Sequence, residues 1–412
     1  MMKKWKEQRV NIILGSFLGI LILLMLLATI CDHSKVSYDH LQKVEPDSVE
    51  KLADGGSVVE LTIDKSVKKC TTVAFCTPHQ YVDVYVDGRD VYSLKETAGR
   101  WGHTTGHVWN FVLLPVNTTH LTVKLSPCYP ETANALLTYY VGNGREICMG
   151  LMRQSLPTFI ISFIILIVGI YMLGYWLLVC KSEDVDATLL YLGLFSVILG
   201  LWTANETDFA KLLLVNQHAT TFAAYILLMA MPIPFVLFVR SFLDFDDKNI
   251  WRVFCGFSMV MCVISCVLHF TGIWELRQSL ILTHIVIVGL LIYLMRAIVF
   301  KFVKRQVGRR LRTCIAALIL VILASIADLI NYYKVGGNTG IWGRISFLIF
   351  IVILGVESAS KTASMLRRDR RVKELEQFAL NDTMTGLYNR NAYNYYVKSA
   401  PDIADTMIVT FD

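Results

Sequence analysis

The sequence predicts a multi-domain membrane protein with an all-α polytopic membrane core of one N-terminal span plus seven, an exported all-β sandwich and the beginning of a cytoplasmic α/β domain. Of its 412 residues, 55% are hydrophobic and only 17% are charged, whereas soluble proteins average about 25% charged residues. The apolar residues gather in blocks of about 20, the length that crosses a hydrocarbon core about 30 Å thick. Between the first two blocks lies a long segment with strand-like alternation. An ordinary soluble enzyme is therefore excluded.

The first apolar block, residues 10–30, follows a basic N-terminus at residues 1–9, which we expect in the cytoplasm. Its length favours a transmembrane anchor, since the apolar region of a cleaved signal peptide is usually about 7 to 15 residues long. Both interpretations, anchor or signal peptide, keep the basic flank inside and export the segment that follows.

Seven more apolar blocks within residues 158–357 predict a module of seven transmembrane helices. They lie at about 158–180, 187–204, 219–239, 253–272, 280–300, 313–332 and 344–357. If the preceding segment is exported, the loops at 181–186, 240–252 and 301–312 are cytoplasmic, as is the chain from Ser358. The positive-inside rule agrees, because basic residues crowd the last of these loops and the region directly after the final block.

The distribution of charge says more than the formal net charge of +6. Three predicted cytoplasmic patches, at residues 1–9, 301–312 and 361–373, together carry +14, which leaves −8 for the rest. This pattern orients the chain against an anionic lipid leaflet, so membrane lipid is an expected partner and nucleic acid is not. We expect a multi-pass protein of the inner or plasma membrane, with residues 31–157 extracellular and the C-terminus cytoplasmic.

The exported segment, residues 31–157, predicts an all-β sensor domain. Strands are expected at 59–64, 72–75, 81–86, 108–114, 121–125 and 136–141, several of them with the period-two pattern of a strand that buries one face. Asp87 and Gly88 supply a two-residue turn before a returning strand at Val91. Short strands at this spacing fit a sandwich of the jelly-roll kind.

Cys70 and Cys76 are the candidate disulfide of the exported domain. They lie in a compartment where disulfides form, at what we expect to be adjacent strand ends. The cysteines in the apolar blocks are better explained as small buried hydrophobic side chains, and no cysteine spacing predicts a metal site.

Two pairs of polar residues near the exported ends of the membrane helices are candidates for a sensing pocket. They are Asp328 with Asn331, and Glu206 with Asp208. Ionisable groups near a membrane core mark functional sites, but a side chain close to the interface reaches water at little cost. Both interpretations, sensing-pocket residue and interfacial residue, stay open.

Residues 358–380, after the last block, predict a signalling helix with a short coiled coil. Met365, Val372, Leu375 and Ala379 fall on the a and d positions of a heptad pattern, and charged residues occupy other faces. A dimeric signalling helix, and with it a homodimer, is one interpretation. An ordinary solvated helix is the other.

Residues 381–393, NDTMTGLYNRNAY, are the most informative stretch of the chain. They closely resemble the opening signature of GGDEF domains, the diguanylate cyclase family, which reads D-x-L-T-G-L-x-N-R-x-x-[FY]. The matching residues are Asp382, Thr385, Gly386, Leu387, Asn389 and Arg390, and Met384 replaces the usual leucine. We expect Asp382 and Thr385 to stop the incoming helix through local hydrogen bonds and Gly386 to permit the bend that follows.

The resemblance implies that residues 381–412 begin an α/β cyclase domain. An apolar strand at 407–411 ends at Asp412, which by position is similar to the aspartate that binds the catalytic Mg²⁺ in this family. An ordinary aspartate at a strand end is the other interpretation. The implied reaction condenses two GTP molecules to cyclic di-GMP and two pyrophosphates. Because the GGDEF turn would lie beyond Asp412, we expect an N-terminal fragment that holds no catalytic residue and is inactive as given.

The predicted helices and sandwich also resemble bacterial receptors that join seven transmembrane helices and an extracellular sensing module to cytoplasmic signalling domains. This resemblance rests on topology and on the pattern from His79 through Trp109 to Pro115. It implies a carbohydrate-binding-like jelly roll, and thus an extracellular small molecule, with carbohydrate as one class. Aromatic residues that could stack on a sugar, although strand aromatics usually belong to the core, are Tyr81, Tyr85, Tyr92, Trp101 and Trp109.

The sequence therefore predicts a membrane-bound sensor that controls cyclic di-GMP synthesis. The alternative is a non-catalytic membrane receptor or scaffold with a degenerate or absent cyclase domain. A transporter is disfavoured, because the sequence shows no obvious inverted repeat and no paired interrupted helices, and because the 381–393 signature would stay unexplained.

Overall fold

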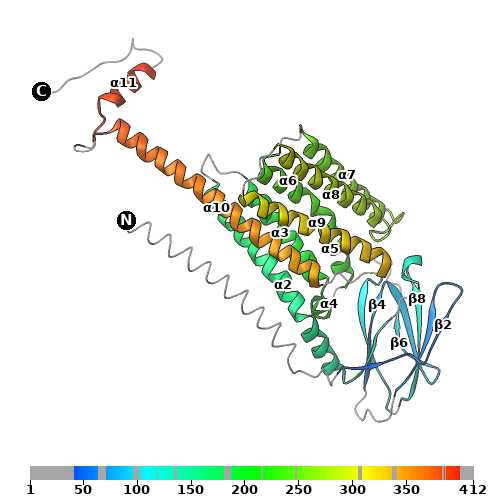
Figure 1. The fold of residues 1–412 in the computed structure, drawn as a ribbon. Helices are drawn as coiled ribbons and strands as arrows, with labels where there is room; N and C mark the ends of the chain where they lie inside the picture. Colours follow the sequence, from blue (N-terminus) through cyan, green and yellow to red (C-terminus); the bar gives the residue numbers. More distant parts are fainter. Residues whose placement is uncertain are drawn as a thin grey trace.

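The computed structural model describes residues 41–63, 71–95, 102, 104–116, 118–133, 137–180, 187–214, 217–245, 248–304, 309–335, 341–382, 385 and 387–399. Within these ranges a two-sheet β-domain is followed by a bundle of long helices (Figure 1). The β-domain lies at one end of the bundle, and the last long helix leaves from the opposite end. The predicted block at 10–30 and the predicted strand at 407–411 lie outside the described residues.

Two antiparallel sheets form a β-sandwich. One has the strand order β1-β9-β4-β7 and the other the order β2-β3-β8-β5-β6. The strands are β1 (Gln42–Val44), β2 (Ser48–Lys51), β3 (Ser57–Thr62), β4 (Thr72–Pro78), β5 (Gln80–Val86), β6 (Arg89–Leu94), β7 (His107–Leu113), β8 (His120–Pro127) and β9 (Tyr139–Gly142). A single 3₁₀ turn, Pro130–Thr132, follows β8. The predicted strands coincide with β3, β4, β5, β7, β8 and β9.

Period-two alternation builds the core of the sandwich. Val82 and Val84 of β5 are buried in the same cluster as Phe75 of the opposite sheet, while the residues between the valines point away. Asp87 and Gly88 have φ angles of 49° and 77° between the paired strands β5 and β6. Two positive φ angles are what a tight hairpin turn requires, so the predicted turn is confirmed.

Each apolar block between residues 158 and 357 coincides with helical structure. The helices are α2 (Gly144–Val179), α3 (Thr188–Asn205), α4 (Asp208–Leu213), α5 (Gln217–Ala230), α6 (Pro232–Leu243), α7 (Ile250–Phe270), α8 (Leu280–Val303), α9 (Arg309–Val335) and α10 (Ile341–Leu380). Among the described residues, six helical segments are long and apolar enough to cross a membrane, one of them formed by α5 and α6 together. Helix α9 adds a shorter apolar stretch, Cys314–Ala327. The chain is a multi-pass membrane protein.

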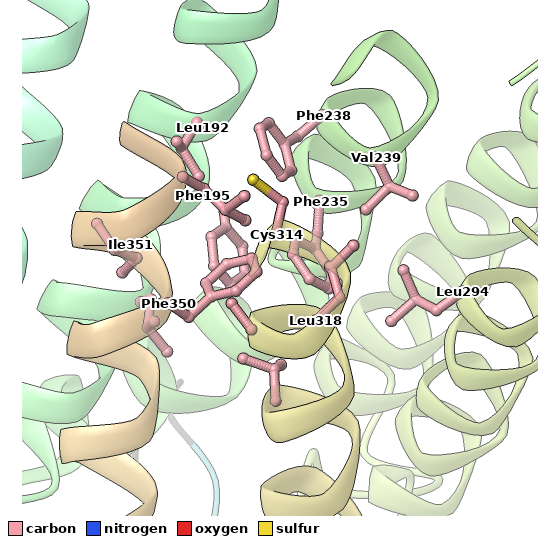
Figure 2. Close-up of a cluster of buried hydrophobic side chains, with 14 of the residues drawn as sticks. Leu192, Phe195, Phe235, Phe238, Val239, Leu294, Cys314, Leu318, Phe350 and Ile351 are labelled. Carbon is pink, nitrogen blue, oxygen red and sulfur yellow. The ribbon is translucent and has the colours of Figure 1, made fainter. Parts of the chain in front are cut away.

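Aromatic side chains fill the centre of the bundle (Figure 2). The rings of Phe195 in α3 and Phe235 in α6 are stacked with centroids 4.5 Å apart, and Phe350 of α10 approaches Phe235 edge-on at 5.6 Å. Cys314 of α9 reaches the same cluster and is buried there as a small apolar side chain. The cluster therefore joins four helices that are distant in sequence.

Glycines allow α2 and α3 to approach closely. A Cβ on Gly200 would lie 2.7 Å from the backbone nitrogen of Leu166, and a Cβ on Gly169 would lie 2.8 Å from the backbone nitrogen of Val197. No side chain fits at such distances, so the crossing depends on glycine. Close contact through small residues is a common way for membrane helices to associate.

Two helices are much longer than a membrane span. Helix α2 begins directly after β9, with Asn143 as its N-cap, and its 36 residues extend about 54 Å. Helix α10 has 40 residues and extends about 60 Å. The two helices pack against each other, with Gly355 of α10 facing Met172 of α2. One connection from the sandwich to the far end of the protein thus runs through these two long helices and the contact between them.

Candidate functional site at the junction of the sandwich and the bundle

The outer face of the sheet β1-β9-β4-β7 rests on the bundle. Ala74 and Tyr140 on that face pack against Ile147 and Leu151 in the first turns of α2. The same apolar contact includes Leu41, Trp109, Phe111 and Leu212. We call this contact, together with the polar groups described next, the junction. Removal of these apolar side chains from water favours the docked position of the sandwich.

Two hydrogen bonds cross the junction. The indole Nε1 of Trp109 donates to Oδ1 of Asp208 at 3.2 Å. Asp208 stands at the start of α4, where the hydroxyl of the N-cap residue Thr207 accepts from the backbone of the first turn. The hydroxyl of Tyr129 donates to the carboxylate of Glu275, which lies in the loop between α7 and α8. The sandwich is therefore bonded to the bundle at two separate points.

A pair of histidines lies beside the bond between Tyr129 and Glu275. The rings of His79 and His107 are 5.2 Å apart and edge to face, and the Tyr129 ring is 5.6 Å from that of His79. His79 is 1% exposed, and its Nδ1 shares a hydrogen bond of 2.6 Å with the hydroxyl of Thr104. His79, Thr104 and Tyr129 are thus almost closed to water, whereas His107 is half-buried.

Burial and the charges of the bundle set the protonation of this cluster. Burial, with added repulsion from Arg277 and Lys211, lowers the pKa of His79 to about 3. Burial also lowers the pKa of His107 well below its ordinary value, and Lys211 again contributes. For Tyr129, burial and its hydrogen bond raise the pKa above the usual range. All three rings are therefore neutral at pH 7.

The end of α7 meets the sandwich at Gly102. A Cβ on Gly102 would lie 3.1 Å from Cε1 of His269 and 3.3 Å from Oε1 of Glu275, so its backbone rests on both side chains. Its φ of 99° also favours glycine. His269 is 8% exposed, and neither of its ring nitrogens has a hydrogen-bond partner among the described residues.

Of the predicted sensing-pocket residues, Asp208 belongs to the junction. Glu206 is the C-cap of α3, two residues earlier in the chain, and is partly exposed. Asp328 and Asn331 lie in the second half of α9, and their side chains are outside the described structure. A pocket shared by all four residues stays a prediction.

The predicted disulfide and metal ligand also stay predictions, because Cys70 and Asp412 lie outside the described residues. Cys76 lies in β4, opposite Trp109 in the register with β7. In the part of the chain that the structure describes, no group of three or more His, Cys, Asp or Glu side chains is placed to hold a metal ion.

The aromatic candidates for sugar binding divide between two environments. Tyr81 and Tyr85 lie on the outer face of β5 and are partly exposed. Tyr92 donates to Asn110 at 2.9 Å, and Trp109 belongs to the junction. Trp101 is outside the described residues. Tyr81 and Tyr85 thus remain the described candidates that face away from the sandwich core.

A compact loop joins α10 to α11 (Arg390–Ser399) at the other end of the protein. Oδ1 of Asp382 accepts from the backbone nitrogen of Thr385 at 2.9 Å and from its hydroxyl at 3.1 Å. The predicted local bonds at the helix end are therefore confirmed. A bridge between Asn381 and Tyr388 closes the loop, and Leu387 is exposed on it. Gly386 lies outside the described residues.

Asn389 ties the two helices of this loop together. Its Nδ2 donates to the carbonyl oxygen of Ala379 at 2.9 Å, and its Oδ1 accepts from the backbone nitrogen of Ala392 at 3.0 Å. One side chain thus satisfies a carbonyl at the end of α10 and an N–H in the first turn of α11. Arg390, the first residue of α11, is exposed.

Sequence reasoning missed most of the junction. Tyr129, Glu275, Arg277 and the histidine pair were not predicted as site residues. One signal was present, since the short loop at 271–279 places two charged residues between apolar blocks. The bonding partners of the bundle residues are 99 and 146 positions away in sequence, and no local pattern connects them.

Comparison with known proteins bears on the bundle. Residues 157–358, just under half of the chain, match the family described as 7TM diverse intracellular signalling. The match runs from within α2 to within α10 and includes every helix between them. No curated protein matches the chain. The bundle is therefore a seven-transmembrane module similar to this family of signalling-receptor domains, which indicates that the chain is a membrane sensor.

Proposed function

We propose that the protein is a membrane receptor that senses an extracellular signal and controls cyclic di-GMP synthesis in the cytoplasm. The sandwich is the external sensing domain, and the bundle passes the signal across the membrane. Residues 381–412 begin a diguanylate cyclase domain. In the full-length protein, two such domains of a homodimer condense two GTP molecules to cyclic di-GMP and two pyrophosphates.

One observation carries the proposal: α10 is a single uninterrupted helix from the bundle core to the loop at residues 381–389. Phe350 packs the first half of this helix into the bundle, and Asn389 ties α11 to its end. A rigid helix passes a rotation or shift of its membrane half to the domain that follows it. The GGDEF-like signature at 381–393 indicates the class of that domain.

The positions of the basic residues support the orientation. Lys304 is exposed at the end of α8, and Arg367, Arg368 and Arg371 are exposed in the second half of α10, the helix that leaves the bundle at the end opposite the sandwich (Figure 1). Loops rich in Lys and Arg are retained in the cytoplasm. The sandwich is accordingly extracellular, and α10 leads into the cytoplasm from the inner or plasma membrane.

The strand order supports a ligand-binding sandwich. With β2 set aside, the remaining eight strands have the orders β1-β9-β4-β7 and β3-β8-β5-β6, which correspond to a jelly roll. On the outer face of the second sheet, Tyr81 and Tyr85 flank Asp83, which accepts from Ser93 at 2.6 Å and lies opposite Lys124. An aromatic and polar face of this kind suits an extracellular small molecule, and carbohydrate is the first class to test.

Asp412 is the residue that would hold Mg²⁺ in the cyclase domain. It follows the apolar run at 407–411, and a carboxylate is a ligand that Mg²⁺ prefers. The bound metal would neutralise GTP phosphates. This assignment rests on the family resemblance and on the position of Asp412 at the expected strand end.

Insertions in α10 test the proposal. Three or four residues added between positions 366 and 376 turn the a and d seam away from its present direction, whereas seven added residues preserve it. We expect the shorter insertions to change cyclic di-GMP formation by the full-length receptor in membranes supplied with GTP and Mg²⁺. The seven-residue insertion is the matched control and should retain the output of the unmodified receptor.

Two results would count against this assignment. The same output from all the insertions would show that α10 does not transmit the signal. If neither the unmodified receptor nor any insertion variant makes cyclic di-GMP, a non-catalytic receptor or scaffold is favoured instead.

A further inference from the structure

Two cations of the bundle repel a positive charge on the histidine pair of the junction. Lys211 of α4 and Arg277 of the loop at 271–279 both act on the two histidines. The nearby carboxylates of the bundle already accept hydrogen bonds from Trp109 and Tyr129. Other titratable groups of the junction interact with the same cations, with the two carboxylates or with Tyr129; they are Cys76, Cys128, Tyr129, Tyr225, His269 and His284, and the carboxylates are Asp208 and Glu275.

Protonation of His79 or His107 would therefore place a charge in an unfavourable position. His79 is almost completely buried, and its Nδ1 is occupied by Thr104. A buried cation without a carboxylate partner is strongly unfavourable. Separation of the sandwich from the bundle would reduce this cost, because Lys211 and Arg277 belong to the bundle and the rings would move away from both.

We propose that the junction is a proton-binding site, in which His79 and His107 are the acceptors and extracellular acid releases the sandwich from the bundle. The ligand is the hydrogen ion. This inference rests on the proposed function for the outward orientation of the sandwich and for the cytoplasmic output.

The direction of the effect follows from the two states of His79. In the docked state its pKa is about 3, and we expect release, which removes the repulsion from Arg277 and Lys211, to return it towards the ordinary value of about 6.5. The neutral ring therefore favours docking fully above pH 6.5, and this contribution is lost as the pH falls from about 6.5 towards 3. For a full return to that value, the docking equilibrium weakens about tenfold between pH 7.5 and 5.5 for one histidine, and His107 acts in the same direction.

The bond between Tyr129 and Glu275 defines where release occurs. His269 and Glu275 contact the same point of the Gly102 backbone. When the sandwich leaves, Glu275 loses its hydrogen bond to Tyr129. Acid thus weakens the docked state at the histidine pair, which lies beside this bond.

Hydrogen–deuterium exchange of the full-length protein in lipid nanodiscs tests this site. Peptides covering residues 207–214 and 271–279 report on the bundle side of the junction, with exchange times scaled to the intrinsic rate at each pH. We expect their protection to fall about tenfold between pH 7.5 and 5.5, while residues 188–200 of α3 stay protected. Unchanged protection of the junction peptides overturns the proposal without any variant.

Substitutions assign the response to the histidines. The double variant His79→Gln and His107→Gln keeps polar side chains that do not titrate, and it should lose the pH response. His120→Gln is the matched control, because His120 is exposed on β8 and bonds Thr62 at 3.0 Å; it should respond like the unmodified protein. A pH response that survives in the double variant overturns the assignment.

If the double variant does not fold, Arg277→Gln gives a second test. It should weaken the pH response by removing one of the repelling cations, and an undiminished response overturns the assignment.

The exchange experiment separates this inference from the proposed function, because it measures docking and not product. If protection of the junction depends on pH but the receptor makes no cyclic di-GMP, the proton site is retained and the cyclase assignment is refuted. If protection of the junction does not depend on pH but the α10 insertions change cyclic di-GMP output, only the proton site is refuted.

Discussion

The hydrogen bond between Trp109 and Asp208 is the residue-scale contact that is simplest to test. Trp109→Phe removes the N–H donor and keeps a ring against Tyr140, whose centroid is 6.1 Å away. Because the acceptor is a carboxylate, we expect the docking free energy to fall by about 1 to 3 kcal/mol. The measurement is the local opening free energy of peptide 207–214 by hydrogen exchange at pH 7.5.

A double-mutant cycle controls this prediction. Asp208→Ala removes the acceptor and also a favourable charge in the first turn of α4. If the two side chains interact, the double variant should lose less than the sum of the single losses. Additive losses would show that the bond itself does not stabilise docking.

Tyr129 should make docking of the sandwich weaker at alkaline pH, the opposite direction to the effect expected of the histidine pair. Burial and its bond to Glu275 raise its pKa above the ordinary value of about 10. The neutral hydroxyl favours the docked state, so its contribution is complete below about pH 10 and is lost as the pH rises above that value. We expect the melting temperature of the unmodified protein to fall more between about pH 9 and about pH 11 than that of Tyr129→Phe. Equal falls would contradict this role.

Hydrogen bonds between residues that are close in sequence could be predicted from the sequence. Asp382 and Thr385 are three positions apart, so their hydrogen bond follows from a known turn pattern. Asp208 could be singled out because an ionisable residue beside an apolar block is uncommon. Its donor Trp109 could not, since that pairing depends on how the sandwich rests on α4.

At the scale of elements, the crossing of α2 and α3 depends on glycine. Gly200→Ala would place a Cβ 2.7 Å from the backbone nitrogen of Leu166, and backbone cannot move aside as a side-chain tip can. We expect a stability loss of about 1 to 3 kcal/mol, seen as a lower melting temperature in nanodiscs. Gly174→Ala in α2 is the matched control, because a Cβ there meets nothing within 4 Å. Equal effects of the two substitutions would refute the close crossing.

The link between α10 and α11 depends on Asn389. Asn389→Ala removes its bonds to Ala379 and to the first turn of α11, and loss of such a cap costs about 1 kcal/mol. We expect faster hydrogen exchange in residues 390–399 and a weaker dependence of output on the state of the bundle. Asn391→Ala, at an exposed position of α11, is the control. Unaltered exchange in the Asn389 variant would show that the tie is dispensable.

Periodic patterns predicted the elements better than their ends. The predicted first helix of the seven starts at about 158, whereas α2 starts at Gly144. Its first turns are amphipathic, with Arg145 exposed and Ile147 buried against the sandwich, so they do not register as a uniformly apolar span. Helix α4 has only six residues, too few for a periodic signal.

At the scale of the whole molecule, one series of contacts connects the junction with the far end of α10 (Figure 1). Strand β9 continues into α2, whose Ile147 and Leu151 lie under the sandwich. Farther along, α2 packs on α10 at Gly355. In the mechanism that we propose, release of the sandwich would uncover the first turns of α2 and remove its contact with Ala74 and Tyr140. A small shift of α2 then changes the position of α10 and of everything that follows it.

The part of α10 beyond the bundle predicts how two receptors associate. Val372 and Leu375 are 52% and 67% exposed there and lie on the seam formed with Met365 and Ala379. Pairing with a second copy would remove these apolar side chains from water. Leu375→Glu should therefore weaken dimerisation of the full-length receptor by about tenfold or more, measured by native mass spectrometry across a protein dilution series. Arg367→Glu lies on the same helix away from the seam and should leave the dimer intact, so equal behaviour of the two variants would place the dimer contact elsewhere.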